Sequence, residues 1–278
     1  MNVFVNSLPK SGTNMVQKCL ELASISYSGR SVAASSCFGK YELVKKVFRH
    51  PRIREVPVVI GLEVPVSVSP GWLSTYLRDA KGYVSGHAAY SMHLKRILAN
   101  ENYKVIQVVR HPGAVLSSWA NYIAEPGYYW NAMYRQMAEL DFEGRVESIL
   151  EGGGKDGRFH YLRFRDVLAK IEEWLNSPEV LVIRYEDIVG LKGGGSDELQ
   201  SATVRRIFEH INYEANNETI DYVVNNLYGG THTFRMGSVH AWKDKVSMNL
   251  LDKIDEQLRG SPYLIRLGYE IKDESGVL

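Results

Sequence analysis

The sequence has little of three features that mark common protein classes. It has two cysteines, Cys19 and Cys37, and no Cys-x-x-Cys pair, which argues against a disulfide framework or structural zinc and favours a reducing compartment. No apolar run reaches the roughly 18–20 residues that a membrane helix needs. The 33 Lys and Arg residues nearly balance 32 Asp and Glu residues. We therefore expect a cytoplasmic protein that coats neither nucleic acid nor a membrane.

What is present is typical of a globular chain. The 278 residues are 45% hydrophobic and 23% charged, which suits a chain that buries a large core. A strand-like run over residues 2–6 leads directly into a turn at Ser7–Gly12, so no signal peptide is expected.

Short apolar runs alternate with helical patterns, as in βαβ units around a mostly parallel sheet. We predict an α/β fold with helices on both faces of the sheet, organised as one three-layer domain over residues 1–278. The predicted strands are 3–6, 58–62, 82–85, 105–109 and 180–183, and the predicted helices are 14–23, 89–99, 112–122, 164–175, 198–210 and 218–227.

The first informative segment joins the first strand to the first helix. Lys10, Ser11, Gly12, Thr13 and Asn14 stand where free N–H groups of a helix N-terminus meet the carboxyl end of a strand. Lysine adds charge, glycine allows close approach, and the other side chains add hydrogen bonds. The segment lacks the Gly-Lys pair of a Walker A loop. Anion binding and an ordinary capped helix start both fit this segment alone.

A second strand end repeats this arrangement. The strand ends at Arg110, and the following helix carries Ser117 and Ser118. An arginine at this edge can hold a phosphate with two hydrogen bonds, and a serine about two turns later can face the same point. A surface ion pair is the alternative for Arg110.

A third segment, residues 233–243, follows a Gly229-Gly230 break and has no clear period. It carries Arg235, Gly237 and Lys243, and long irregular loops of this kind are often functional.

Taken in order, the three segments resemble the motifs of the sulfotransferases that use 3′-phosphoadenosine 5′-phosphosulfate (PAPS). Pro9–Thr13 is similar to the family's 5′-phosphosulfate loop, Arg110–Ser118 to its 3′-phosphate motif, and Phe234–Lys243 to its C-terminal loop. Residues 180–187 and 203–212 resemble the elements between the last two motifs. The resemblance implies a P-loop-like fold, PAPS as donor, adenosine 3′,5′-bisphosphate (PAP) as product, and in-line transfer to a hydroxyl or amine.

The resemblance also implies roles for individual residues. Lys10 would act on the leaving oxygen, with Lys10, His87 and Ser118 as the catalytic group. Tyr185 would contact the adenine region. The implied donor-binding residues are Lys10, Ser11, Gly12, Thr13, Asn14, Arg110, Ser118, Tyr185, Arg235, Met236 and Gly237.

His87 is the expected general base. It follows the strand over 82–85 and precedes a helix, so it should lie at the same sheet edge as Lys10. The alternative is a residue that merely starts a helix. His111 is the only other base that we consider. No histidines have metal-ligand spacing, so no metal is expected.

Three positions depart from the family pattern. Met15 stands where a tryptophan often covers adenine, Met236 replaces a lysine, and Ala241 replaces the aspartate before Trp242. Donor binding should therefore depend strongly on Arg110 and Arg235. No dimerisation motif is found in residues 243–258, which leaves the oligomeric state open.

The acceptor is expected to be a small molecule or a saccharide. An aromatic stretch could form its pocket or belong to the core and a lid, and both interpretations stay open. The stretch consists of Trp119, Tyr122, Tyr128, Tyr129, Trp130 and Tyr134.

Two alternative functions are a P-loop-type nucleotide or small-molecule kinase and an inactive nucleotide-binding module of the same fold. The formal Gly-x-Gly-x-x-Gly at 152–157 neither follows a good strand nor opens a helix, so we interpret it as a loop.

Overall fold

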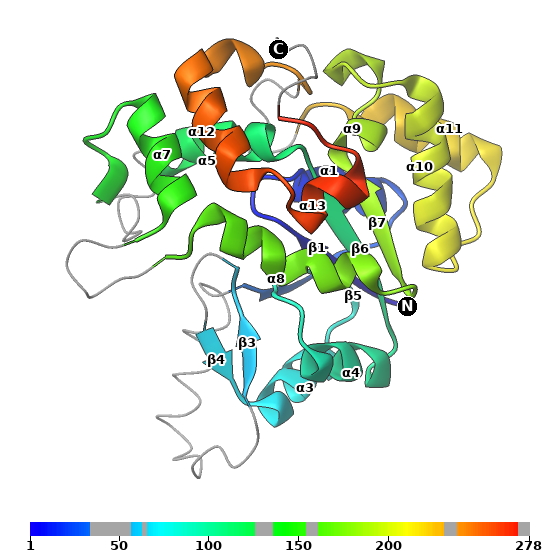
Figure 1. Cartoon of the computed structure of the whole chain (residues 1–278). Helices are drawn as coiled ribbons and strands as arrows, with labels where there is room; N and C mark the ends of the chain where they lie inside the picture. Colours follow the sequence, from blue (N-terminus) through cyan, green and yellow to red (C-terminus); the bar gives the residue numbers. More distant parts are fainter. Residues whose placement is uncertain (34–56, 63–65, 126–135, 154–160, 231–237, 272–278) are drawn as a thin grey trace.

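A computed structural model describes residues 1–33, 57–62, 66–125, 136–153, 161–230 and 238–271. Its central sheet has five strands in the order β2-β5-β1-β6-β7, and every neighbouring pair is parallel (Figure 1). This confirms the predicted α/β class. The strands are β1 (Asn2–Ser7), β2 (Tyr27–Val32), β5 (Gly82–Gly86), β6 (Tyr103–Val109) and β7 (Val180–Arg184).

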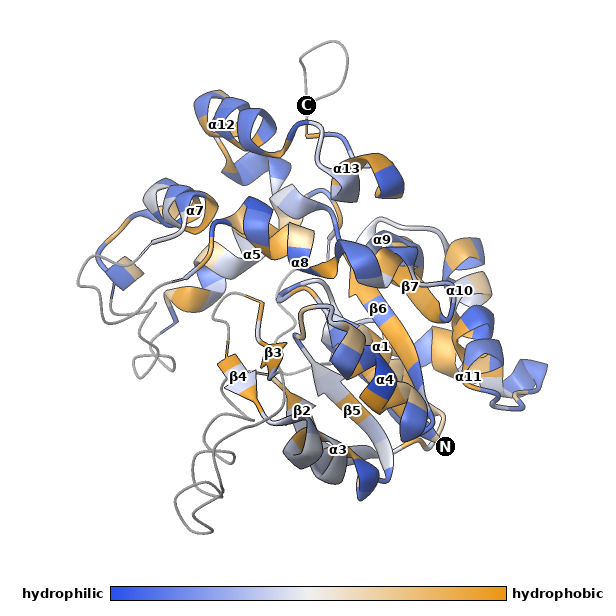
Figure 2. Ribbon diagram, turned by 60° about the horizontal axis from the view of Figure 1, so that its bottom comes forward, coloured by the Kyte–Doolittle hydropathy of each residue, from blue (hydrophilic) through white to orange (hydrophobic). Residues whose placement is uncertain are grey.

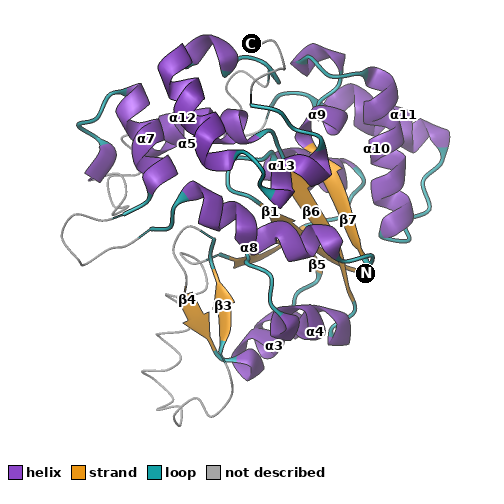
Figure 3. Cartoon of the chain, in the orientation of Figure 1, coloured by secondary structure: helices purple, strands orange, loops and turns teal. Residues whose placement is uncertain are grey.

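The two faces of the sheet are both covered by helices (Figure 3). Alternate residues of β1 point to opposite faces: Val3 and Val5 join one buried cluster, and Phe4 joins the other. Burial on both faces explains the nearly continuous apolar colour of β6 in Figure 2. The first cluster includes residues of α1 (Thr13–Leu22), α10 (Asp197–His210) and α11 (Asn217–Leu227), and the second those of α4 (Met92–Asn100), α5 (Pro112–Ile123) and α8 (Phe164–Asn176).

One predicted strand lies elsewhere. Residues 58–62 were expected in the parallel sheet, but β3 (Val58–Ile60) pairs antiparallel with β4 (Val66–Val68) in a separate two-stranded sheet. The edge of the central sheet is instead formed by β2, whose register with β5 is irregular. Its sequence, Tyr-Ser-Gly-Arg-Ser-Val, is largely polar because only its last residue is buried, so it has no apolar run to reveal it.

The predicted helices are present, with boundaries shifted by up to three residues. The helix expected over 89–99 begins at Met92 because the Ser91 hydroxyl accepts the Leu94 N–H at 3.1 Å and caps it. Several other helices are present that the sequence pattern does not predict: α3 (Pro70–Arg78), α7 (Phe142–Glu151), α9 (Tyr185–Ile188), α12 (Met248–Leu258) and α13 (Pro262–Leu267). No helix in the described part of the chain is long and apolar enough to cross a membrane.

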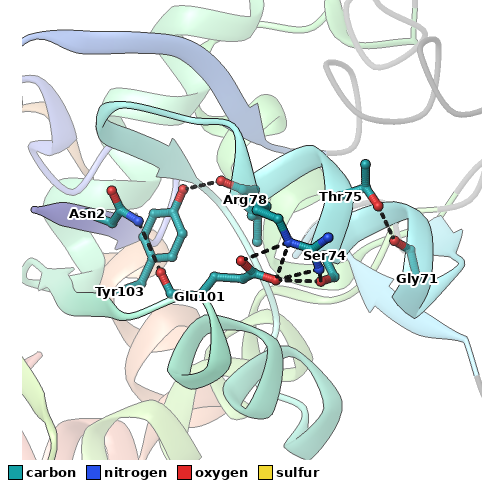
Figure 4. Close-up of polar contacts among 8 residues, drawn as sticks. Asn2, Gly71, Ser74, Thr75, Arg78, Glu101 and Tyr103 are labelled. Atoms are coloured by element: carbon teal, nitrogen blue, oxygen red, sulfur yellow. Dashed lines mark hydrogen bonds and ion pairs between the residues drawn. The ribbon is translucent and has the colours of Figure 1, made fainter.

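At the end of the sheet where the strands begin, Glu101 connects several segments through hydrogen bonds (Figure 4). Its carboxylate accepts from the Ser74 hydroxyl at 2.7 Å and pairs with Arg78, and its backbone oxygen accepts from the Asn2 side chain at 3.0 Å. These polar groups satisfy one another. Lys10, His87 and Arg110, which the sequence predicts as functional, lie at the opposite end of the sheet, just after the ends of β1, β5 and β6.

Candidate active site

The loop from Ser7 to Thr13, called here the 7–13 loop, turns sharply between β1 and α1. Lys10 and Gly12 both have left-handed backbones, with φ of 66° and 95°. A Cβ on Gly12 would lie 2.4 Å from the Tyr185 ring, so only glycine fits this close approach. The Ser11 hydroxyl is buried and has no hydrogen-bond partner among the described residues. A buried unpartnered hydroxyl beside a helix N-terminus is suited to a hydrogen-bonding anion.

Arg110 joins the three segments that the sequence singled out. Its Nη1 lies 3.5 Å from the Lys10 carbonyl oxygen and its Nη2 lies 3.3 Å from the Ser238 carbonyl oxygen. Its guanidinium lies over the Tyr185 ring, 4.1 Å from the centroid. The Arg110 side chain is therefore the point where the ends of β1, β6 and β7 meet. Ser238, the residue that follows the 231–237 segment, lies at the same point.

The charge of Arg110 is buried, and no carboxylate among the described residues forms a salt bridge with it. Burial lowers the pKa of its guanidinium, and the Nε is a buried donor for which the described residues offer no partner. The described residues also give it no salt bridge, because the oxygens of Glu186 accept from the His111 N–H at 2.8 Å and the Tyr269 hydroxyl at 2.7 Å. A buried cation without an anion is unfavourable. A bound anion at Arg110 would relieve this cost.

His87 lies at the same edge, held by the last residue of β1. Its Nδ1 is 3.0 Å from the Ser7 carbonyl oxygen, and its backbone N–H donates to Val32 at 3.1 Å. A carbonyl oxygen only accepts, so the neutral ring that makes this bond carries its hydrogen on Nδ1. Its Nε2 then has a lone pair that can accept a proton.

The residue after His87 is fixed by a buried amide network. The Asn6 side chain accepts the Ala88 N–H at 2.8 Å and donates to the Ala88 carbonyl at 3.0 Å and to Gln107 at 2.7 Å. Trp174 also donates to the Ala88 carbonyl, at 3.1 Å. Asn6 and Gln107 are both fully buried. The backbone next to His87 is therefore held by the side chains of Asn6 and Trp174.

The Lys10 ammonium lies over the Tyr122 ring of α5, 3.8 Å from its centroid. Ser118 stands four residues before Tyr122, so both are on the same face of α5. Lys10 is thus directed at the helix face that carries Ser118. Trp119, by contrast, is buried in the core, where its ring packs edge-on against Phe164.

His111 is a structural residue. Its Nδ1 accepts the Gly113 N–H at 3.1 Å, and its Nε2 lies 2.8 Å from the Glu270 carbonyl oxygen. Its ring stacks on Trp242 with centroids 4.7 Å apart, and burial lowers its pKa. Both ring nitrogens of His111 make hydrogen bonds to the backbone, so neither is available to act as a base. His111 differs in this respect from His87.

Several predicted site residues lie outside the described residues. They are Arg235, Met236 and Gly237, together with Tyr128, Tyr129, Trp130 and Tyr134 of the aromatic stretch. Met15 is buried in the core cluster between α1 and the sheet. Among the described residues, no group of three or more His, Cys, Asp or Glu side chains is arranged to hold a metal ion.

The sequence analysis missed Asn6, Ser7, Gln107 and Tyr263. Tyr263 is fully buried, and its hydroxyl donates to the Arg110 carbonyl at 2.8 Å. The signal for Asn6 and Gln107 was a polar residue inside an otherwise apolar strand, which requires a specific partner when buried. The positions of their partners depend on the packing of distant segments.

Comparison with family models shows which family the chain belongs to. The model for the sulfotransferase domain matches residues 1–260. The chain belongs to the sulfotransferase family. Among solved structures, this sulfotransferase is similar to mouse sulfotransferase SULT7A1 complexed with PAP, with a TM-score of 0.60 and 16% sequence identity; the match covers 96% of this chain and 88% of that chain. That likeness supports the fold. No curated protein sequence matches the chain.

Proposed function

We propose that this sulfotransferase transfers a sulfuryl group from PAPS to a hydroxyl or amine of a small-molecule or saccharide acceptor. The observation that carries the proposal is Arg110, a buried arginine with an unpartnered Nε at the junction of the three segments. Such a cation is suited to a ligand that brings its own negative charge, as the 3′-phosphate of the donor does.

The 7–13 loop fits the other end of the donor. Its buried Ser11 hydroxyl has no hydrogen-bond partner in the part of the chain that the structure describes, and the close approach of Gly12 to the Tyr185 ring leaves no space for another side chain. When bound, the donor supplies the sulfuryl group and a bisphosphate leaving group. The residues proposed to hold it are Lys10, Ser11, Gly12, Thr13, Asn14, Arg110, Ser118, Tyr185, Arg235, Met236 and Gly237.

His87 is the proposed general base. With the hydrogen of Nδ1 held by the Ser7 carbonyl, its Nε2 is the nitrogen that accepts the acceptor's proton. In the imidazolium that forms, the Nδ1–H still donates its hydrogen bond to the Ser7 carbonyl oxygen. The Lys10 ammonium, on the α5 face that carries Ser118, supplies positive charge for the leaving oxygen.

The test has a binding step and a turnover step. PAP should raise the thermal unfolding temperature, and radiolabelled PAPS should give a sulfated product with at least one member of a panel of phenols, alcohols, amines and saccharides. His87→Ala should abolish transfer with PAP binding retained, and Lys10→Ala should weaken both. No stabilisation by PAP, or no sulfated product with any acceptor, would refute the proposal, and full turnover by the His87→Ala protein would refute the role of His87 as the base.

The same assay separates the two other functions. A kinase would need Mg²⁺ and ATP, whereas we expect transfer from PAPS that continues in EDTA. An inactive nucleotide-binding module would bind PAP and fail with every acceptor.

A further inference from the structure

A line of polar groups connects the first residue of α1 with His87. The Ser7 hydroxyl, fully buried at the end of β1, is hydrogen-bonded to the Thr13 hydroxyl and lies 3.1 Å from His87 Nδ1. The carbonyl oxygen of the same serine lies 3.0 Å from Nδ1. Ser7 is therefore hydrogen-bonded both to Thr13, the first residue of α1, and to the His87 ring.

The hydrogen bonds among Thr13, Ser7 and His87 can be donated in either of two directions, because each hydroxyl has a single hydrogen to donate. If Thr13 donates to Ser7, the Ser7 hydroxyl is able to donate to Nδ1, and a neutral ring that accepts this bond carries its hydrogen on Nε2 and gives up the bond to the Ser7 carbonyl. If Thr13 donates elsewhere, Ser7 donates to Thr13 and accepts from Nδ1–H. Only the second direction leaves Nε2 with a lone pair that can accept a proton.

An anion at the 7–13 loop selects the second direction. Thr13 begins α1, where free N–H groups and the helix dipole favour negative charge, and the buried Ser11 hydroxyl beside it lacks a partner. An anion placed there accepts the Thr13 hydrogen. The Thr13 oxygen then accepts from Ser7, and the Ser7 oxygen accepts from His87. Hydrogen bonds aligned in one direction strengthen one another.

We propose that Ser7 is a positioning residue through which a nucleotide phosphate at the 7–13 loop fixes His87 in the Nδ1–H tautomer. This inference rests on the proposed function of His87. His87 can act as the base once a phosphate occupies the 7–13 loop. The proton of the acceptor then moves to Nε2, while the hydrogen on Nδ1 stays hydrogen-bonded to Ser7. With the loop empty, part of the His87 population carries its hydrogen on Nε2 and cannot accept.

The tautomer can be read without turnover. Long-range ¹H–¹⁵N correlation spectra of protein labelled at histidine distinguish the two tautomers, with the His87 signals assigned by comparison with His87→Asn. Saturation of the unsubstituted protein with PAP should increase the Nδ1–H fraction of His87. In Ser7→Ala, PAP should bind within about twofold of the normal affinity and leave that fraction unchanged. An unchanged fraction in the unsubstituted protein, or an equal response in Ser7→Ala, would overturn the inference.

Kinetics provide a second readout. Ser7→Ala should lower kcat about tenfold, the scale of one hydrogen bond to a charged ring, with the donor KM within about twofold. Ser7→Thr keeps the hydroxyl and should restore kcat. Ser177→Ala is the matched control, because it removes another buried serine hydroxyl that bonds only the Glu173 carbonyl, at 2.9 Å. It should leave kcat unchanged. A normal kcat in Ser7→Ala would contradict the inference.

Failure of this inference and failure of the proposed function are distinguishable. If His87→Asn is inactive and Ser7→Ala behaves normally in both readouts, His87 is the base and Ser7 does not set its tautomer. If His87→Asn retains turnover, the assignment of His87 as the base fails, and if PAPS gives no sulfated product with any acceptor, the proposed function itself fails.

Discussion

The guanidinium of Arg110 and the ring of Tyr185 stack with 4.1 Å between the guanidinium carbon and the ring centroid, although 75 positions separate them in the sequence. The same ring fills the space beside Gly12. Tyr185 therefore fixes both the arginine after β6 and the loop after β1. This contact defines the relative position of the two groups that we assign to opposite ends of one nucleotide.

Arg110→Met should separate stability from binding. Removal of a buried cation that forms no salt bridge with the described residues should leave the thermal stability of the nucleotide-free protein unchanged or raise it. PAP affinity should fall about 10- to 100-fold, the range of a charge-assisted hydrogen bond. Calorimetric titration measures the affinity. Arg78→Gln, which removes an exposed arginine paired with Glu101, is the control and should bind PAP normally. Equal affinities in the two variants would contradict the assignment.

Gly12→Ala should destabilise the protein more than Gly29→Ala. Both glycines have positive φ, at 95° and 72°, and each substitution should cost about 1–2 kcal/mol from backbone strain. Only the new methyl group at position 12 meets a neighbour, the Tyr185 ring, whereas nothing lies within 4 Å at position 29. Urea unfolding gives the difference. If the two losses were equal, Gly12 would not be in close contact with Tyr185.

The stability of the protein should fall in acid partly through His111. Burial holds its pKa below the ordinary value, so the unfolded state binds a proton more readily and stability decreases as the pH falls below about 6.5. His111→Asn keeps an acceptor for the Gly113 N–H and does not titrate. Between pH 7.5 and 5.5 this variant should lose about 1 kcal/mol less unfolding free energy than the unsubstituted protein. An identical loss would mean that the pKa of His111 is the same in the folded and unfolded states, which would contradict the effect of burial.

Asn6→Ala should be strongly destabilising because it leaves the Ala88 N–H and the Gln107 oxygen without their partner. We expect a loss of about 2–4 kcal/mol in unfolding free energy. Asn121→Ala is the matched control, since that side chain bonds only to a carbonyl of its own helix, and it should cost less than about 1 kcal/mol. Similar losses in the two variants would mean that the Asn6 network is not cooperative.

The sequence predicts the centre of the fold better than its edges. Strands such as β6 are apolar on both faces because helices cover both, and this pattern is visible without a structure. The edge strand β2 is half-exposed and polar, so its pairing depends on β5 and not on its own residues. The β3–β4 pair shows the reverse: Val58–Ile60 is apolar enough for a core strand but pairs within a separate sheet.

The same distinction holds for the candidate site. Lys10, His87 and Arg110 could be predicted because each follows a strand that ends at one edge of the sheet. Ser7 and Asn6 could not, since their roles depend on which atoms of His87 and Ala88 come within hydrogen-bond distance. His111 shows the limit of position alone: it adjoins Arg110 in sequence, yet the backbone of Gly113 and Glu270 occupies both of its nitrogens.

The convergence of the 7–13 loop, Arg110 and Tyr185 on one nucleotide is tested most directly by a crystal structure of the protein with PAP bound. We expect the 5′-phosphate on the backbone N–H groups of Ser11–Thr13, the 3′-phosphate on the Arg110 guanidinium, and the adenosine beside Tyr185. A nucleotide bound at any other place, or an Arg110 guanidinium without contact to either phosphate, would contradict the proposed donor site.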